Sequence, residues 1–178
     1  MVDLIVLQSL SYVAAAIGVC VAGIYYAMVL REQSRNRRVT LTSNLMQTIF
    51  SPNGVRNFLD LIHMEWTDYS DFESKYGTEN NLDSASVRIS IWSTLNVLGE
   101  LLREGLVDLN TLYNAIEFFT VLIWDKFEPV VKEHRRRYMS RDQWTGFEYL
   151  AGKMLAVMKE KDSEYKVPKT YDKYIPDK

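Results

Sequence analysis

Histidine and carboxylate side chains are the first candidates for chemistry in this sequence. His63 follows Asp60 by three residues, which places both on one helix face and resembles half of a carboxylate–histidine metal site. A di-iron helical bundle needs a Glu-x-x-His pair on each of two helices, but the second histidine, His134, has Val131 at that spacing. Zinc sites with three or more His or Cys ligands are excluded too, because Cys20, the single cysteine, lies in an apolar segment. We therefore predict no metal and interpret His63 as a structural or surface residue.

Motifs for nucleophilic catalysis and phosphate binding are also absent from the sequence. It contains no Gly-x-Ser-x-Gly, and its glycines are scattered rather than clustered at a strand-to-helix turn. We predict no cofactor, and the sequence favours a binding module over an enzyme. The alternative is a membrane-tethered enzyme or effector whose site is assembled from dispersed polar residues. A deep pocket on which Asp60, His63, Glu65 or Arg88 converged would favour that alternative.

A basic run near the C-terminal end is the best candidate for a binding surface. Its cations are Lys132, Arg135, Arg136, Arg137 and Arg141, with His134 among them. They could simply stabilise the C-terminal end of a helix through its dipole. They could pair with the acidic stretch between Asp60 and Asp83, within the chain or between protomers. They could also face a protein partner or anionic lipid headgroups, each charge contributing roughly 1 kcal/mol near the lipid surface.

Four arginines at the end of an apolar stretch indicate where the chain lies. Residues 4–30 carry no charge and exceed the roughly 20 helical residues that cross a bilayer. Arg31, Arg35, Arg37 and Arg38 follow directly, whereas a cleavable signal peptide has its basic residues before the apolar run. We predict a single transmembrane helix. By the positive-inside rule, the arginines lie at the cytoplasmic lipid headgroups, the N-terminus lies outside and the C-terminal domain is cytoplasmic.

Small residues in the predicted span suggest self-association. Ala14, Gly18 and Ala22 recur every four residues and therefore share one helix face, as in small-xxx-small helix pairs. We hypothesise a homodimer through this face. The alternative is that alanine and glycine are simply common in membrane spans.

Composition limits the remainder of the 178-residue chain. Without the span, about 120 ordered residues are left, which suits one domain with a single core. That part is mildly acidic, so we predict no nucleic-acid binding, which requires a basic surplus. With Cys20 alone, no disulfide can form within the chain.

Apolar residues recur at helical spacing almost throughout, so we expect an all-α fold. The span should continue as a juxtamembrane helix to residue 50, and a helix capped by Ser51 and Pro52 should follow. Its predicted buried stripe is Val55, Leu59, Ile62 and Trp66. A capping box of Ser70 and Glu73 should open a short helix that Gly77 closes.

The strongest helical pattern covers residues 84–104 and predicts a central helix, whose main apolar stripe is Val87, Ile91, Leu95, Leu98 and Leu102. Asp108 should cap the next helix, which should run to Pro129, with a shorter helix restarting there and ending at Met139. A second capping box, Ser140 and Gln143, should precede the last helix. Its predicted buried face is Trp144, Phe147, Ala151, Met154 and Met158.

One family resemblance accompanies these patterns. The residues that carry it are Tyr25-Tyr26, Leu30-Arg31-Glu32-Gln33, Arg35, Arg37-Arg38, the stretch from Leu41 through Phe50, and Trp124-x-x-Phe127-x-Pro129. They resemble an uncharacterised prokaryotic family of single-span membrane proteins known as a domain of unknown function. The resemblance implies a membrane-anchored helical domain and transfers no catalytic residues.

The sequence thus predicts a transmembrane helix over residues 4–30, a juxtamembrane helix over 31–50, a cytoplasmic helical domain over 51–160 and a flexible tail over 161–178. The domain should be a bundle of about five to seven helices. As a function we predict an interaction, scaffold or sensor module anchored in the cell membrane.

Overall fold

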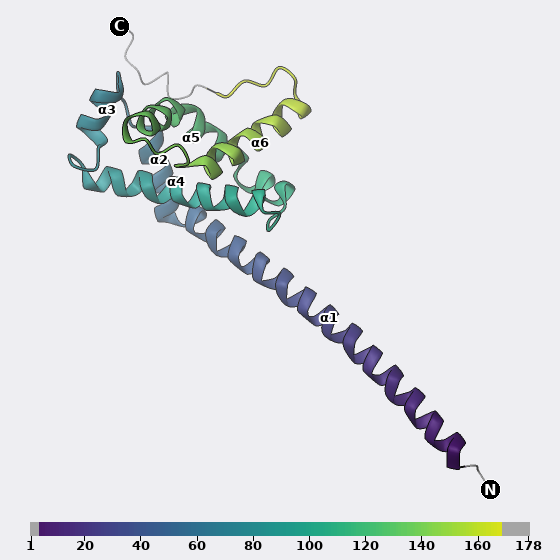
Figure 1. The fold of residues 1–178 in the computed structure, drawn as a ribbon. Helices are drawn as coiled ribbons and strands as arrows, with labels where there is room; N and C mark the ends of the chain where they lie inside the picture. The colour runs from purple at the N-terminus through teal and green to yellow at the C-terminus, as the bar shows by residue number, and fades with distance from the viewer. Residues whose placement is uncertain (1–3, 169–178) are drawn as a thin grey trace. The chain divides into compact units, whose positions relative to one another are not determined.

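A computed structural model describes residues 4–168 of the chain, and the side chains of residues 4–7, 9 and 38 lie outside that description. Six α-helices and no strand occur in the described part, which confirms the all-α prediction (Figure 1). The helices are α1 (Leu4–Phe50), α2 (Pro52–Ile62), α3 (Tyr69–Tyr76), α4 (Leu82–Arg103), α5 (Leu109–Tyr138) and α6 (Thr145–Lys161). The chain divides into two compact units, Met1–Leu41 and Thr42–Lys178, with the boundary inside α1.

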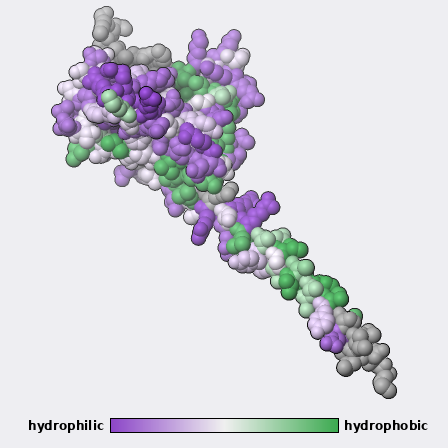
Figure 2. All heavy atoms as spheres, viewed as in Figure 1, coloured by the Kyte–Doolittle hydropathy of each residue, from purple (hydrophilic) through white to green (hydrophobic). Residues whose placement is uncertain are grey.

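The first unit contains the apolar part of α1 and the arginine-rich segment that follows it. Its large apolar side chains, among them Val13, Ile17 and Ile24, are exposed along the whole stretch. Within the described residues, one helix is long and apolar enough to cross a membrane, and none of its apolar window is buried. Figure 2 shows the apolar surface of α1 giving way to a hydrophilic segment further along the helix. By length and composition, α1 is therefore a candidate membrane span.

The second unit is built around α4. Helix α6 packs on α4 and on α5, while α2 also contacts both of these helices. Ile91, Leu95 and Leu98 of α4 are buried, as the periodicity of the central helix predicts. The closest approach of α4 and α6 is made by two glycines: a Cβ on Gly99 would lie 1.8 Å from the carbonyl oxygen of Gly146. The two backbones therefore touch with no side chain between them.

Helix α5 is longer than the sequence pattern predicts. The Asp108 cap is confirmed, since its carboxylate accepts a hydrogen bond from the Thr111 backbone N–H at 2.9 Å. The predicted break at Pro129 is wrong, because α5 continues through the proline to Tyr138. Proline costs a helix one backbone hydrogen bond and some strain. Here that cost is offset by burial on both sides of it, at Phe127 and Val131.

The buried face of α2 agrees with the prediction at Ile62, which is buried, and differs from it at Val55 and Leu59. Val55 and Leu59 are 37% and 47% exposed, whereas Phe58 and Leu61 are buried. The reason is the tight connection to α1: a Cβ on Gly54 would lie 2.2 Å from a backbone carbonyl oxygen in the last turn of that helix. This contact turns the glycine face of α2 inward, and the residues one turn further along that face enter the core.

Two predicted helix starts are displaced. Helix α3 is capped by Asp68, whose carboxylate accepts from the Asp71 backbone N–H at 2.9 Å, rather than by a Ser70 capping box. Gly77 follows the end of α3 as predicted. Helix α6 begins after Trp144, which adopts a left-handed conformation with φ 64° and makes no side-chain cap. Burial of Trp144 against the core selects this start over the predicted capping box.

The segment after α6 lies against the domain as far as the structure describes it. Tyr165 and Val167 pack on the core, and the Lys161 ammonium lies 4.0 Å from the centroid of the Tyr113 ring. Residues 169–178 of the predicted flexible tail, and residues 1–3 of the predicted external N-terminus, lie outside the described residues.

Candidate functional site

The basic run covers the C-terminal end of α5, except for Arg141, which follows the helix, and most of its cations have acidic partners close by. Lys132 pairs with Glu128 at 2.8 Å, and Glu133 pairs with both Arg136 at 2.6 Å and Arg137 at 2.8 Å. All of these partners belong to α5 itself. The two arginines hold the pKa of Glu133 at about 2, well below its usual 4.5.

Arg135 is the member of the run that ties α5 to α6. Its side chain is 16% exposed, its Nη1 lies 2.6 Å from a Glu148 carboxylate oxygen, and its Nε donates to the Gln143 carbonyl at 2.7 Å. Lys132, Arg136, Arg137 and Arg141 are exposed, and we call these four residues the α5 basic surface. The run therefore combines one structural arginine with a solvent-facing group.

A contact between α5 and α3 lies next to the α5 basic surface. The Tyr69 hydroxyl and His134 Nδ1 lie 3.1 Å apart, and this hydrogen bond joins residues 65 positions apart in sequence. The Arg137 guanidinium lies 4.2 Å from the centroid of the Tyr69 ring. Burial raises the pKa of Tyr69, as does the neighbouring Glu73 carboxylate, so the phenol stays protonated. Burial lowers the pKa of His134 below its usual 6.5, which favours the neutral imidazole at neutral pH.

Arg88 of α4 lies next to this contact and is 7% exposed. Its guanidinium carbon is 4.8 Å from the centroid of the Phe72 ring and 5.4 Å from that of Trp92. Within the described part of the chain, neither Arg88 Nε nor Trp92 Nε1 has a hydrogen-bond partner. Burial lowers the pKa of Arg88, while Glu73 raises it. We call Tyr69, Glu73, Arg88, Trp92 and His134 the Arg88 cluster.

Sequence reasoning named Arg88 only as one dispersed polar candidate. The available signal was its position: it precedes Ile91 by three residues and Trp92 by four, so helical periodicity places it on the buried face of α4. A charged residue at an apolar position of a central helix needs a partner or a role. The Tyr69 and His134 neighbours could not be found this way, because they belong to other helices.

The other polar residues that could build an enzyme site differ from Arg88 in their exposure to solvent. Asp60, His63 and Glu65 are exposed, and His63 Nδ1 lies 2.7 Å from the carbonyl oxygen of Leu59 in the preceding helical turn. No group of three or more His, Cys, Asp or Glu side chains that could hold a metal ion occurs in the part of the chain searched, residues 4–168 with the gaps given above.

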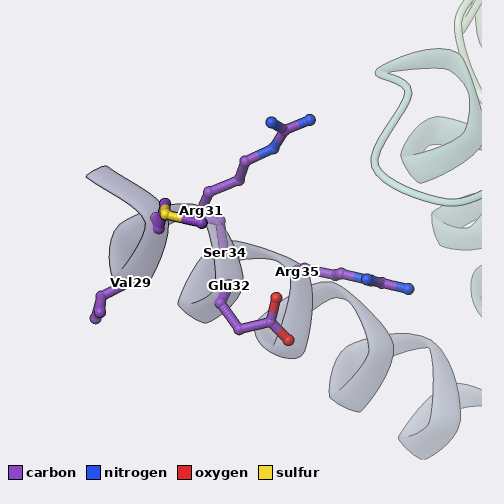
Figure 3. A pocket seen from close by; sticks show the side chains of 6 residues that line it. Val29, Arg31, Glu32, Ser34 and Arg35 are labelled. Carbon is purple, nitrogen blue, oxygen red and sulfur yellow. The ribbon is translucent and has the colours of Figure 1, made fainter. Parts of the chain in front are cut away.

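One hollow borders α1, and its lining comes from that helix alone. The lining residues are Met28, Val29, Arg31, Glu32, Ser34 and Arg35. Figure 3 shows Arg31, Glu32 and Arg35 leaving the helix in different directions rather than converging on one point. This arrangement presents separate charges to the surroundings and lacks the convergent donors of a small-molecule site.

The predicted membrane-proximal residues lie on exposed faces of α1. Arg31, Arg35 and Arg37 are exposed, and the Arg38 side chain lies outside the description. Ala14, Gly18 and Ala22 are exposed as well, and a Cβ placed on Gly18 would meet nothing within 4 Å.

The fold and these sites define an all-α protein with one candidate membrane span and a helical domain that carries a basic surface and a buried arginine cluster. The chain belongs to the family described as a domain of unknown function, DUF4760, whose model matches residues 12–154. The predicted resemblance to a domain of unknown function is confirmed to that extent. No curated protein and no solved structure matches the chain.

Proposed function

We propose that this chain is a single-pass membrane protein whose cytoplasmic helical domain acts as an interaction, scaffold or sensor module. The observation that carries the proposal is the exposed apolar surface of α1 followed by the arginines of residues 31–38. A continuous apolar surface of this size is unfavourable in water. A bilayer would cover it, and the arginines would stay at the cytoplasmic headgroups.

Alkaline extraction of membranes tests the anchor directly. The full chain should stay in the membrane pellet after a carbonate wash, because the hydrocarbon core holds the apolar stretch of α1. Ile17→Lys combined with Val21→Lys should shift the chain towards the supernatant, since each charge at the centre of a span costs about 2.5–3.5 kcal/mol. Ser34→Lys, which adds a charge beyond the stretch, is the matched control. Release of the unaltered chain by the wash would contradict the proposal.

Self-association through α1 is part of the same proposal. The small face of Ala14, Gly18 and Ala22 would let two spans approach closely. Crosslinking of the full chain in membranes should then yield a dimer that Gly18→Leu weakens. Ala16→Leu makes the same kind of change on the opposite face and should leave the dimer intact. Equal dimer yields for both variants would exclude this interface.

The α5 basic surface is the proposed contact with a lipid or protein partner. Flotation of the fragment from Val39 onward, which includes the second compact unit, with anionic vesicles at low salt tests the lipid case. Arg136→Gln, Arg137→Gln and Arg141→Gln together should reduce flotation. The control replaces Lys153, Lys159 and Lys166 with glutamine and removes the same charge elsewhere. If the fragment does not float, the lipid case fails, and pull-down from solubilised membranes with the same two variants then tests a protein partner.

A further inference from the structure

Arg88 is a buried cation that forms no ion pair with the described residues of its own chain. Its side chain is more than nine-tenths buried, with 7% exposed, and no carboxylate of the described residues lies within the 4.0 Å that defines an ion pair. Arginine cannot shed its charge, since it stays protonated in proteins. Burying an unpaired charge is costly, so the site gains if an anion reaches the guanidinium.

A second unpaired donor lies one helical turn away. Trp92 Nε1 is buried without an acceptor, and its ring is 5.4 Å from the Arg88 guanidinium carbon. A buried donor left unpaired lowers the stability of the folded state, because it has given up its hydrogen bond to water. Arg88 and Trp92 are four residues apart, so both donors belong to the same buried face of α4.

The remaining members of the Arg88 cluster determine how much negative charge a bound anion can carry and from which side solvent reaches the site. Glu73 is the acid whose charge reaches Arg88, yet it forms no ion pair with it. It would repel a doubly charged anion more than a singly charged one. Tyr69 and His134 are half-buried, and Arg137 beside them is exposed, so this side of the cluster lies next to solvent.

We propose that the Arg88 cluster is a binding site for a small carboxylate. A planar carboxylate matches the guanidinium edge, where one oxygen can accept from Nε and the other from an Nη. Trp92 Nε1 would supply a further donor. The single negative charge would neutralise Arg88 next to Glu73, whereas a phosphate dianion would bring more charge than the site balances. The ligand class follows from the two unpaired donors of α4 and from the Glu73 charge on α3, independently of the membrane anchor.

The experiment observes the two donors directly in the full chain in detergent micelles. With ¹⁵N-labelled arginine and tryptophan, the Nε–H resonance of Arg88 and the indole N–H of Trp92 are assigned by Arg88→Lys and Trp92→Phe. Acetate is the probe, titrated at constant ionic strength against chloride. Both resonances should shift together and saturate, with one shared dissociation constant. The Nε–H of Arg103, an exposed arginine of the same helix that pairs with Glu100 at 2.9 Å, should not follow that curve.

Other outcomes would overturn the inference. Absence of a saturable shift at Arg88 would mean that water or a rearranged Glu73 satisfies the donors. Parallel drifts at Arg88 and Arg103 would show a general salt effect. Tighter saturation with inorganic phosphate than with acetate would exclude the carboxylate class. Because the titrations use the unaltered chain, they stand even if Arg88→Lys fails to fold, in which case Trp92→Phe and the indole resonance still report.

Discussion

Neighbouring arginines of one helix meet different surroundings in this protein. Arg135 is 16% exposed and bonds to Glu148 of α6 and to the Gln143 carbonyl that precedes α6, whereas Arg136 is 71% exposed and pairs with an acid of its own helix. Exposed pairs within one helix contribute little, because water screens them and holding both side chains costs entropy. A charged hydrogen bond shielded from solvent contributes more.

Arg135→Met should therefore destabilise the domain by about 1–2 kcal/mol, whereas Arg136→Met should have a much smaller effect. Denaturant unfolding of the full chain in micelles, followed by tryptophan fluorescence, measures both. The α5 basic surface should keep its binding in Arg135→Met, since that residue does not face solvent. Equal losses of stability in the two variants would show that burial of Arg135 contributes nothing.

His134 makes stability depend on pH. Burial lowers the pKa of its imidazole below 6.5, with the Arg88 charge acting in the same direction and Glu73 opposing it. At pH values between the lowered pKa and 6.5, His134 is largely protonated in the unfolded chain and largely neutral in the folded chain. The contribution of neutral His134 is thus complete above pH 6.5 and is lost as pH falls through the folded pKa.

The melting temperature of the wild-type chain should consequently fall, relative to that of His134→Asn, as pH decreases from about 7.5 to about 5. The asparagine variant cannot titrate, and it keeps every other ionisable group for comparison. Glu133 does not titrate in this pH range, because its pKa of about 2 lies far below it. A constant difference between the two melting curves across the range would refute the role of His134.

At the scale of helices, the crossing of α4 and α6 depends on two residues without side chains. The Cβ of an alanine at position 99 would lie 1.8 Å from a backbone oxygen of Gly146, so the two helices would have to separate. Separation opens gaps along Leu95 and Phe147 in the core.

Gly99→Ala should destabilise the domain by about 1–3 kcal/mol in spite of the higher helix propensity of alanine. Gly152→Ala in α6 is the matched control, since a Cβ on this exposed glycine would meet nothing within 4 Å. It should stabilise by about 0.5–1 kcal/mol. Unfolding measurements on both variants test the crossing, and a neutral Gly99→Ala would show that α4 and α6 are not held this closely.

The elements were predictable where the signal is local. The Asp108 cap, the Gly77 end and the buried faces of α4 and α6 follow from hydrogen bonding and periodicity within one segment. The continuation of α5 through Pro129 was not predictable from local sequence, because packing against other helices outweighs the cost of a proline inside the helix. The Arg88 cluster was missed for the same reason, since its donors and neighbours come from three helices that only the fold brings together.

At the scale of the whole chain, the proposed cytoplasmic location of the domain depends on which of the two groups of cations orients the proposed span. The positive-inside rule counts lysine and arginine within about 15–20 residues of a span and ignores more distant ones. The flank at Arg31–Arg38 falls inside that limit and the α5 basic surface falls far outside it. Only the first group should orient the protein.

Replacing the four flank arginines with glutamine and inserting four lysines after Val2 should therefore move the C-terminal domain of many molecules to the outside. Protease digestion of a C-terminal epitope in intact spheroplasts measures this, because only an external epitope is cleaved. The same substitution to glutamine at Lys132, Arg136, Arg137 and Arg141 removes as many cations and should leave the epitope protected. If the unaltered chain already exposes its epitope, or if both variants do so equally, the charge next to the apolar stretch does not set the orientation. A protected epitope in the unaltered chain and its loss in the flank variant alone would place both the α5 basic surface and the Arg88 cluster on the cytoplasmic side, where small carboxylates and anionic lipids can reach them.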